Sequence, residues 1–285
     1  MKKPRISIIG PGRVGTALLK ALSNQNFEVI TVFSRSTCSE NLIKSHPETH
    51  FKTGLPSHSN ELGELIFITV SDDAIIPVAE TIAENTQELV GKFLVHCSGT
   101  LTSEALKPLK ENGAMVASFH PMKAVTPNML SFKGTWFDME GDEAVLCLLE
   151  NIADELESNS FRVDKEAKPF LHMSAVVASN YLVVLAEIAS VIAQKGNISA
   201  KIALKALAPL MENTLENVRE LGTEEALTGP IARGDVETVR DHIERLKEDE
   251  ELLGLYKSLG RQALLILKRD QRFSENHLEI ETLLS

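Results

Sequence analysis

A glycine-rich segment near the start of the chain constrains the fold more than any other feature of the sequence. It reads Gly10-Pro11-Gly12-Arg13-Val14-Gly15, follows a short β-branched run at residues 6–9, and opens a segment with the apolar spacing of an amphipathic helix. In such a unit the first glycine permits a tight turn, the second lets the backbone approach a pyrophosphate, and the third lets the helix pack closely on the strand. We predict that these six residues bind a dinucleotide; the alternative is a purely structural glycine turn.

The end of the next strand-like segment indicates which dinucleotide is bound. Residues 28–33 have strand character, and Ser34, Arg35 and Ser36 follow them. A site for NAD would place an acidic residue here for the ribose hydroxyls, and its charge would repel a 2′-phosphate. A guanidinium flanked by hydroxyls can instead bind that phosphate through charge-assisted hydrogen bonds. We predict NADP as the cofactor, the alternative for Arg35 being an exposed loop arginine.

Strand-like and helical segments alternate through the first half of the chain. Further strand-like runs occupy residues 65–70, 93–97 and 115–119, with helical patterns between them. Short apolar runs bounded by helices are typical of parallel strands covered on both faces, so we predict an α/β fold with a doubly wound, Rossmann-type sheet. Val70 and Ser71 then end a strand at the carboxyl edge of that sheet, where the nicotinamide half of the cofactor is expected.

The character of the sequence changes at about residue 164. Beyond it we find helical patterns but no convincing strand, which predicts an all-α C-terminal domain. The expected helices cover residues 169–195, 199–221, 236–248, 251–268 and 276–284. We predict two domains, a dinucleotide-binding domain at 1–164 and a helical domain for substrate binding and dimerisation at 165–285.

The overall composition excludes several classes of protein. With 29 basic against 40 acidic residues the formal net charge is −11, and aromatic residues make up 5% of the chain. Such a chain lacks the basic stripe and the stacking platforms with which proteins bind nucleic acids. Cys38, Cys97 and Cys147 lie far apart in the sequence and form neither a metal-binding nor a disulfide pattern. We expect a cytoplasmic protein with no metal site and no nucleic acid partner.

One apolar stretch, residues 170–193, resembles a membrane span in composition. It contains His172, Asn180 and Glu187, which favours a buried helix over a span, and no signal peptide is found at the N-terminus. Because a long apolar helix also suits a subunit interface, we expect a homodimer.

Two predicted strand ends carry residues suited to proton transfer. The first is His96-Cys97-Ser98-Gly99 and the second is Phe119-His120-Pro121-Met122. We predict that His120 acts as an orienting or acid–base group and that Ser98 donates a hydrogen bond to a ligand. His96 is interpreted as a buried strand histidine that has its own hydrogen-bond partners.

The helix that follows residue 164 adds further candidates. Lys168, His172 and Ser179 fall within about 40° of one another on a helical wheel, and Asn180 begins a second polar seam. We predict Lys168 or His172 as the general acid and Asn180 as a substrate contact. The alternative is an exposed lysine at the helix start with a core histidine. In the turn-rich segment 227–235, Arg233 could clamp a substrate carboxylate, and Asp235 is the expected N-cap of the next helix.

These motifs together resemble a bacterial family that joins a Rossmann-like domain to a helical C-terminal domain and is described largely as NADP oxidoreductases. The resemblance covers nearly the whole chain. Its motifs here are GPGRVG, SRS, VSDDAI, VHCSG, SFHPM, KxxxHxxxxxxSN and LTGPIARGD. More distantly the chain is similar to the group of 6-phosphogluconate dehydrogenase, β-hydroxyacid dehydrogenases and ketopantoate reductase, and to pyrroline-5-carboxylate reductase.

The resemblance also bears on individual residues. In the hydroxyacid group a helix lysine followed four residues later by asparagine serves catalysis, whereas this chain has Lys168 followed by His172, so the roles do not transfer unchanged. His120 and Ser98 resemble a histidine and an assisting serine of prephenate dehydrogenases. The resemblance implies an NADP(H)-dependent reductase of a ketone or imine in a small anionic carboxylate, with ketopantoate as a reasonable substrate. The alternatives are a prephenate-type dehydrogenase and a non-catalytic NADP-binding sensor or scaffold.

Overall fold

The computed structural model describes residues 3–126 and 129–285 and divides the chain into two compact units, residues 1–179 and 180–285. The predicted domain boundary at residue 164 lies between the last strand and the first helix that follows it.

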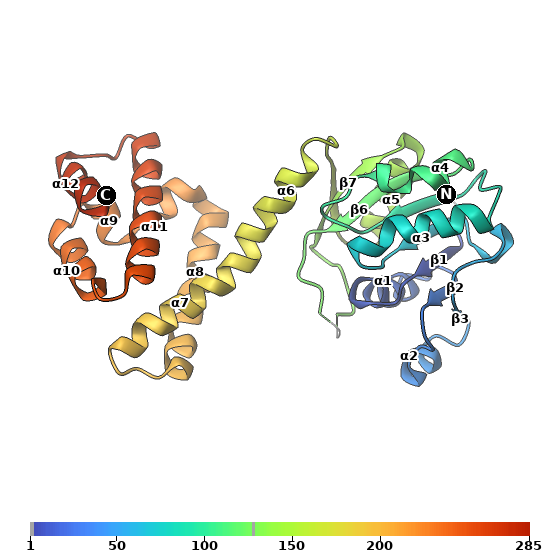
Figure 1. The fold of residues 1–285 in the computed structure, drawn as a ribbon, viewed down its shortest axis with the longest axis horizontal. Helices are drawn as coiled ribbons and strands as arrows, with labels where there is room; N and C mark the ends of the chain where they lie inside the picture. The colour runs from blue at the N-terminus through green and yellow to red at the C-terminus, as the bar shows by residue number, and fades with distance from the viewer. Residues whose placement is uncertain (1–2, 127–128) are drawn as a thin grey trace. The chain divides into compact units, whose positions relative to one another are not determined.

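The first unit is built on one eight-stranded sheet in the order β3-β2-β1-β4-β5-β6-β7-β8 (Figure 1). Neighbouring strands are parallel throughout, except that β6 and β7 are antiparallel. This arrangement confirms the predicted doubly wound sheet. The strands are β1 (Ile6–Ile9), β2 (Val29–Ser34), β3 (His50–Thr53), β4 (Leu65–Ile68), β5 (Phe93–His96), β6 (Met115–Pro121), β7 (Trp136–Gly141) and β8 (Asn159–Arg162).

Helices cover both faces of this sheet. Buried side chains of α1 and α5 pack with one face, and those of α3, η2 and α4 pack with the other. The helices of this unit are α1 (Arg13–Asn24), α2 (Glu40–Ser45), η1 (Ser59–Glu61), α3 (Asp72–Asn85), η2 (Ser103–Leu106), α4 (Lys107–Glu111), α5 (Glu143–Glu155) and α6 (Lys168–Ala175).

Strand β7 brings acidic side chains into the interior. Its residues alternate between the two faces of the sheet, so that Phe137 and Met139 join the core with α1 and α5. Asp138 and Glu140 therefore lie on the opposite face, where they are 1% and 3% exposed. In the antiparallel ladder Asp138 is directly opposite His120 of β6. Residues paired in this way have their side chains on the same face and close together.

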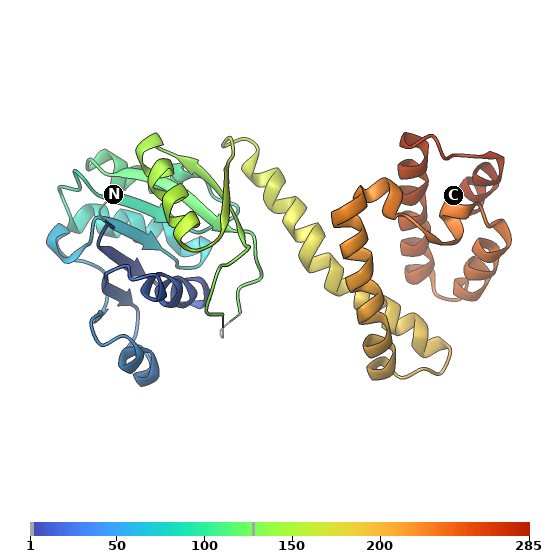
Figure 2. The same ribbon diagram turned by 180° about the vertical axis from the view of Figure 1, so that it is seen from behind.

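The second unit is helical, as predicted, and no strand occurs in the part of it that the structure describes. It contains α7 (Tyr181–Lys195), α8 (Ala200–Ala226), α9 (Gly229–Arg233), α10 (Val236–Leu246), α11 (Glu250–Arg269) and α12 (Glu275–Leu284). In both ribbon views α7 lies alongside α8 (Figures 1 and 2). Helix α8 leaves helical geometry at Gly222, next to the predicted end at residue 221. Asp235 is the N-cap of α10 and accepts a hydrogen bond from the Thr238 amide, as predicted.

The apolar stretch of the sequence forms one continuous helical segment over Lys168–Lys195, through α6, the π-helical turn η3 (Val176–Asn180) and α7. By length and composition alone it could cross a membrane. Only 6% of its most apolar window is buried within this chain, so the expected burial of this helix is not supplied by the chain itself.

Candidate functional site

The carboxyl ends of the parallel strands β1, β2, β4, β5 and β6 lie at one edge of the sheet, because parallel strands all run the same way. The segments that leave these ends carry most of the predicted site residues of the first unit. Ligands bind at this edge in open α/β sheets.

The glycine turn after β1 has the conformation that the sequence predicted. Gly10 has a φ of +93°, and a side chain there would come within 2.6 Å of Val70. Gly15 packs against Gly10 and Thr69, where no Cβ could be accommodated. The Cβ position of Gly12 is open, its nearest neighbour being the Thr69 carbonyl oxygen at 3.9 Å. An open backbone at the N-terminus of α1 fits the approach of a pyrophosphate.

A pocket of about 600 Å³ lies beside this turn, between α1 and the end of β2. Pro11, Ser34 and Ser36 line it, together with Lys20 from α1, which the sequence analysis did not single out. Arg35 is exposed and does not line the pocket. An ammonium group among hydroxyls fits a phosphate, so the pocket suits the 2′-phosphate half of NADP with Lys20 as the lining cation.

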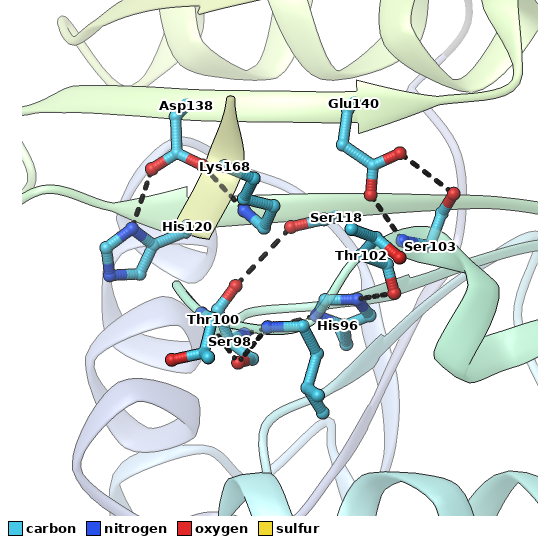
Figure 3. Close-up of polar contacts among 11 residues, drawn as sticks. His96, Ser98, Thr100, Thr102, Ser103, Ser118, His120, Asp138, Glu140 and Lys168 are labelled. Carbon is cyan, nitrogen blue, oxygen red and sulfur yellow. Dashed lines mark hydrogen bonds and ion pairs between the residues drawn. The ribbon is translucent and has the colours of Figure 1, made fainter. Parts of the chain in front are cut away.

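Three side chains from β6, β7 and α6 form a hydrogen-bonded cluster (Figure 3). The carboxylate of Asp138 accepts a hydrogen bond from His120 Nδ1 at 2.7 Å through Oδ2, and one from Lys168 Nζ at 2.6 Å through Oδ1. The lysine side chain is 0% exposed and the aspartate side chain 2%, whereas the imidazole is 19% exposed. The second ring nitrogen of His120, Nε2, is therefore the atom of this cluster that is free to meet a ligand.

The two basic side chains of this cluster favour the ionised form of Asp138. Burial opposes ionisation of Asp138, but the hydrogen bond from His120 and the charge of Lys168 outweigh it and hold the pKa of Asp138 below its usual range. The alternative of an exposed Lys168 at the helix start is wrong, since its ammonium is buried on Asp138.

Asp138 is a candidate site residue that the sequence alone does not single out. A signal was present, since Phe137 and Met139 alternate with Asp138 and Glu140 over residues 136–141. That alternation predicts a strand, yet it places the acidic residues on the face expected to meet solvent.

The two polar residues at the end of β5 have structural partners. His96 is 0% exposed, its Nε2 bonds to the Thr102 carbonyl oxygen at 3.0 Å, and burial lowers its pKa to about 4. This agrees with the interpretation of His96 as a satisfied buried histidine. Ser98 is 4% exposed, and its Oγ accepts hydrogen bonds from the amides of Thr100 and Leu101. Through these two bonds the Ser98 hydroxyl stabilises its own loop.

His172 lies close to His120, as the sequence analysis expected for two groups of one site. The ring centroids are 6.2 Å apart, and His172 Nδ1 is buried with no hydrogen-bond partner among the described residues. Ser179, expected on the same helix face, is exposed. Residues 177–181 are all exposed, and the π-helical turn at Val176–Asn180 departs from the α-helical period on which the expected face depends.

The remaining predicted residues lie outside the hydrogen-bonded cluster. Val70 is half-buried against Gly10, and Ser71 is the N-cap of α3. Asn180 and Arg233 belong to the second unit, where both are exposed, and the guanidinium of Arg233 lies 4.0 Å from Asp235. In the residues that the structure describes, no group of three His, Cys, Asp or Glu side chains is arranged to hold a metal ion.

Comparisons with protein families agree with this architecture. Residues 1–121 match the model of the Rossmann-like domain, and residues 135–263 match that of a domain of unknown function, DUF2520. The chain thus joins a Rossmann-like domain to a DUF2520 domain. This pairing confirms the resemblance drawn from the motifs. A comparison with curated proteins gives no match.

Solved structures share the fold over almost the whole chain. BF3122 of Bacteroides fragilis, a protein with a proposed NADP oxidoreductase activity, is 24% identical, with a TM-score of 0.71 over 92% of this chain and 98% of its own. Protein TM1727 of Thermotoga maritima is 26% identical, with a TM-score of 0.72 over 93% and 99%. A reductive aminase of Aspergillus terreus in complex with NADPH and ethyl-5-oxohexanoate is 18% identical, with a TM-score of 0.69 over 97% and 98%.

Proposed function

We propose that the protein is an NADP(H)-dependent oxidoreductase that reduces a ketone or an imine in a small carboxylate. The observation that carries this proposal is the Lys168–Asp138–His120 cluster at the same sheet edge as the glycine turn. BF3122 and the reductive aminase share this fold, and their names associate NADP chemistry with it, which supports the proposal.

The cofactor residues follow from the turn and the pocket. We assign the backbone of Gly10, Pro11, Gly12, Arg13, Val14 and Gly15 to the pyrophosphate, and Val70 and Ser71 to the nicotinamide side. Ser34, Ser36 and Lys20 are assigned to the 2′-phosphate, since all three line the pocket. Arg35 is adjacent to that pocket in the sequence and remains a second candidate cation.

Within the cluster we assign proton transfer to His120. NADPH, when bound, supplies the hydride that reduces the substrate carbon. His120 Nε2 is positioned to donate a proton to the substrate heteroatom, because Nδ1 is fixed on Asp138. The sequence alone predicts Lys168 or His172 as the acid. We now assign Lys168 to positioning, because its ammonium is buried and bonded to Asp138.

The substrate contacts and the assembly are assigned from exposed side chains. We retain Arg233 as a carboxylate anchor and Asn180 as a substrate contact, because both side chains are exposed. A homodimer would cover the apolar surface that α7 and α8 expose. The free cysteines Cys38, Cys97 and Cys147 fit a reducing, cytoplasmic location. The domain division near residue 164 stays a prediction.

The test is NADPH oxidation by the purified protein with a panel of substrates. The panel contains ketopantoate and other 2-keto acids, 1-pyrroline-5-carboxylate, and a ketone supplied together with an amine. We expect turnover of at least one member, and a loss of roughly 100-fold or more in kcat in His120→Asn. Absence of turnover with every member, from a protein that binds NADPH, would favour the sensor or scaffold alternative.

The prephenate-type alternative is distinguished in the same assay. It requires Ser98 to assist at the substrate, but the Ser98 hydroxyl oxygen is bonded to two backbone amides. We therefore expect no NADP⁺ reduction with prephenate. Reduction with prephenate at a rate above that of any panel member would replace the proposed reductase with that dehydrogenase.

A further inference from the structure

Gly99, directly after Ser98, lies between the two histidines of the site. A Cβ built on this buried glycine would lie 2.7 Å from His172 Nδ1, and 2.8 Å from both Nε2 and Cε1 of His120. Its φ is outside the left-handed region, so an alanine there would clash with neighbouring atoms but would not strain the backbone. The missing side chain is what allows the two imidazoles to converge above this residue.

The two facing ring nitrogens differ in their surroundings. His120 Nε2 is the free nitrogen of a ring whose Nδ1 is bonded to Asp138. His172 Nδ1 is buried and has no partner among the described residues. An unpaired polar atom in the interior is costly and calls for an explanation, which a bound ligand atom would supply.

We propose that Gly99 is a positioning residue. Its lack of a side chain lets His120 Nε2 and His172 Nδ1 lie close enough to form hydrogen bonds with the same heteroatom of the substrate. The proposal rests on the proposed function and specifies how that site binds the group to be reduced. The two nitrogens are 2.7 Å and 2.8 Å from the Cβ position of Gly99, so they cannot be further apart than the sum of these distances, and a single oxygen or nitrogen atom between them can hydrogen-bond to both. The group so recognised is a carbonyl oxygen or an imine nitrogen.

The two imidazoles then have separate roles in the reduction. NADPH, when bound, would supply hydride to the carbon, and the π electron pair of the C=O or C=N bond would move to the heteroatom. The N–H bond of protonated His120 breaks, and its proton forms the new O–H or N–H bond, which leaves a neutral imidazole for water to reprotonate. The His172 Nδ1–H group donates a hydrogen bond to the same heteroatom and stabilises the charge that develops there.

The first test is Gly99→Ala, with Gly254→Ala as the matched control. Gly254 is an exposed helical glycine with nothing within 4 Å of its Cβ position. We expect Gly99→Ala to retain NADPH binding and to lose roughly 100-fold in kcat/KM, because an ångström-scale misplacement of the acid costs that much. Gly254→Ala keeps the wild-type rate. A folded Gly99→Ala with wild-type kcat/KM overturns the proposal.

A second readout does not depend on turnover, and its main comparison, between the wild type and His120→Asn, does not use Gly99→Ala. In the NADP⁺-bound protein labelled with ¹⁵N-histidine, His120→Asn should shift the ring-nitrogen signals of His172 if the two rings face one another. The same substitution in the Gly99→Ala background should shift them less. Unchanged His172 signals in His120→Asn overturn the proposal. Because this measurement needs no substrate, it separates failure of the paired histidines from failure of the proposed reductase activity.

Discussion

Asp138 holds two side chains of opposite accessibility, a fully buried ammonium and a partly exposed imidazole. One carboxylate oxygen is bonded to each of them. Lys168 and Asp138 form a buried ion pair, and the same carboxylate accepts the hydrogen bond from His120 Nδ1. This arrangement ties the stability of the site to its proposed chemistry.

Replacement of Asp138 tests its contribution to stability and its proposed contribution to catalysis. Asp138→Asn leaves the Lys168 ammonium buried without an anion, and we expect a loss of about 3 kcal/mol in the free energy of unfolding. We also expect kcat to fall roughly 100-fold with KM for NADPH unchanged, since the His120 ring loses its anchor.

Urea unfolding and steady-state kinetics measure these effects. Glu104→Gln, which removes an exposed pair with Lys165, should cost less than about 1 kcal/mol. Equal losses in the two variants would contradict the assigned role.

His96 makes the stability of the protein depend on pH. Burial lowers its pKa to about 4, whereas the unfolded chain has an ordinary histidine pKa of about 6.5. Between these values the unfolded state binds more protons, so stability is fully present above pH 6.5 and falls as the pH decreases toward 4. We expect a loss of about 2 kcal/mol between pH 7 and pH 5 from this residue.

The measurement is urea unfolding at the two pH values. His96→Gln should show a smaller change between pH 7 and pH 5 than the wild type, whatever its stability at pH 7. His50→Gln, at an exposed position, should keep the wild-type change. A wild-type pH dependence in His96→Gln would refute the assignment. Asp138, whose pKa is lowered, adds a separate loss only below about pH 4, its ordinary range.

At the scale of elements, the pocket between α1 and the end of β2 carries the cofactor prediction. A hydrogen bond to a charged group is worth about 1.5–3 kcal/mol, so loss of one cation from a 2′-phosphate site weakens binding by roughly tenfold or more. We expect Lys20→Ala to raise the Kd for NADPH by that factor and to leave the Kd for NADH unchanged. Arg35→Ala, measured in the same way, tests the cation predicted from the sequence alone.

Binding measured by cofactor fluorescence decides this prediction. Lys133→Ala serves as the control, because Lys133 is an exposed lysine paired with Glu157. An equal change for NADPH and NADH in Lys20→Ala would assign the lysine to a part common to both cofactors. Unchanged binding of both would remove Lys20 from the site.

The sequence predicts the central strands of the sheet well and its edge strands poorly. Central strands such as β1 and β4 are continuous apolar runs, which buried parallel strands require. Strand β3 reads HFKT and β8 reads NSFR, and each lies at an edge of the sheet. Edge strands are covered less and need fewer apolar residues, so periodicity does not reveal them.

The sequence predicts the site residues that lie at the ends of strands. It does not predict those that join the site through the pairing of two strands. His120 was found because it precedes Pro121 at the end of a predicted strand. Asp138 reaches His120 only through an antiparallel ladder between strands separated by a long connection. The position of Ser179 was missed because a π-helical turn departs from the α-helical period on which a helical wheel depends.

At the scale of the whole molecule, exposed apolar side chains concentrate on the α7 and α8 helices. Large side chains at 38–70% exposure there are Tyr181, Val183, Val184, Leu185, Ile192, Ile202, Leu204, Leu210, Leu215, Val218 and Leu221. A stable monomer seldom exposes so much contiguous apolar surface, which supports the proposed homodimer.

Light scattering measures the proposed assembly directly. We expect a mass about twice the 31.3 kDa of one chain. Val183→Asp, at a residue that is 70% exposed, should shift the mass toward one chain, because a buried unpaired charge destabilises an interface. Val90→Asp, at an equally exposed valine of the first unit, should leave the mass unchanged. A monomeric wild-type protein that floats with lipid vesicles would instead indicate a membrane surface as the partner.

The antiparallel pairing of β6 with β7 also determines which insertions and deletions the site tolerates. Asp138 meets His120 because the two residues are partners in the ladder, whatever the number of residues in the connection 122–135. A hydrogen bond from the Met122 amide to the Trp136 carbonyl oxygen fixes the start of that ladder. One residue added inside β7 would bring Phe137 or Met139 to the place of Asp138 and turn the carboxylate to the opposite face. Residues added to the connection leave the alternation of side chains in β7 unchanged, so this segment can vary in length without separating Asp138 from His120.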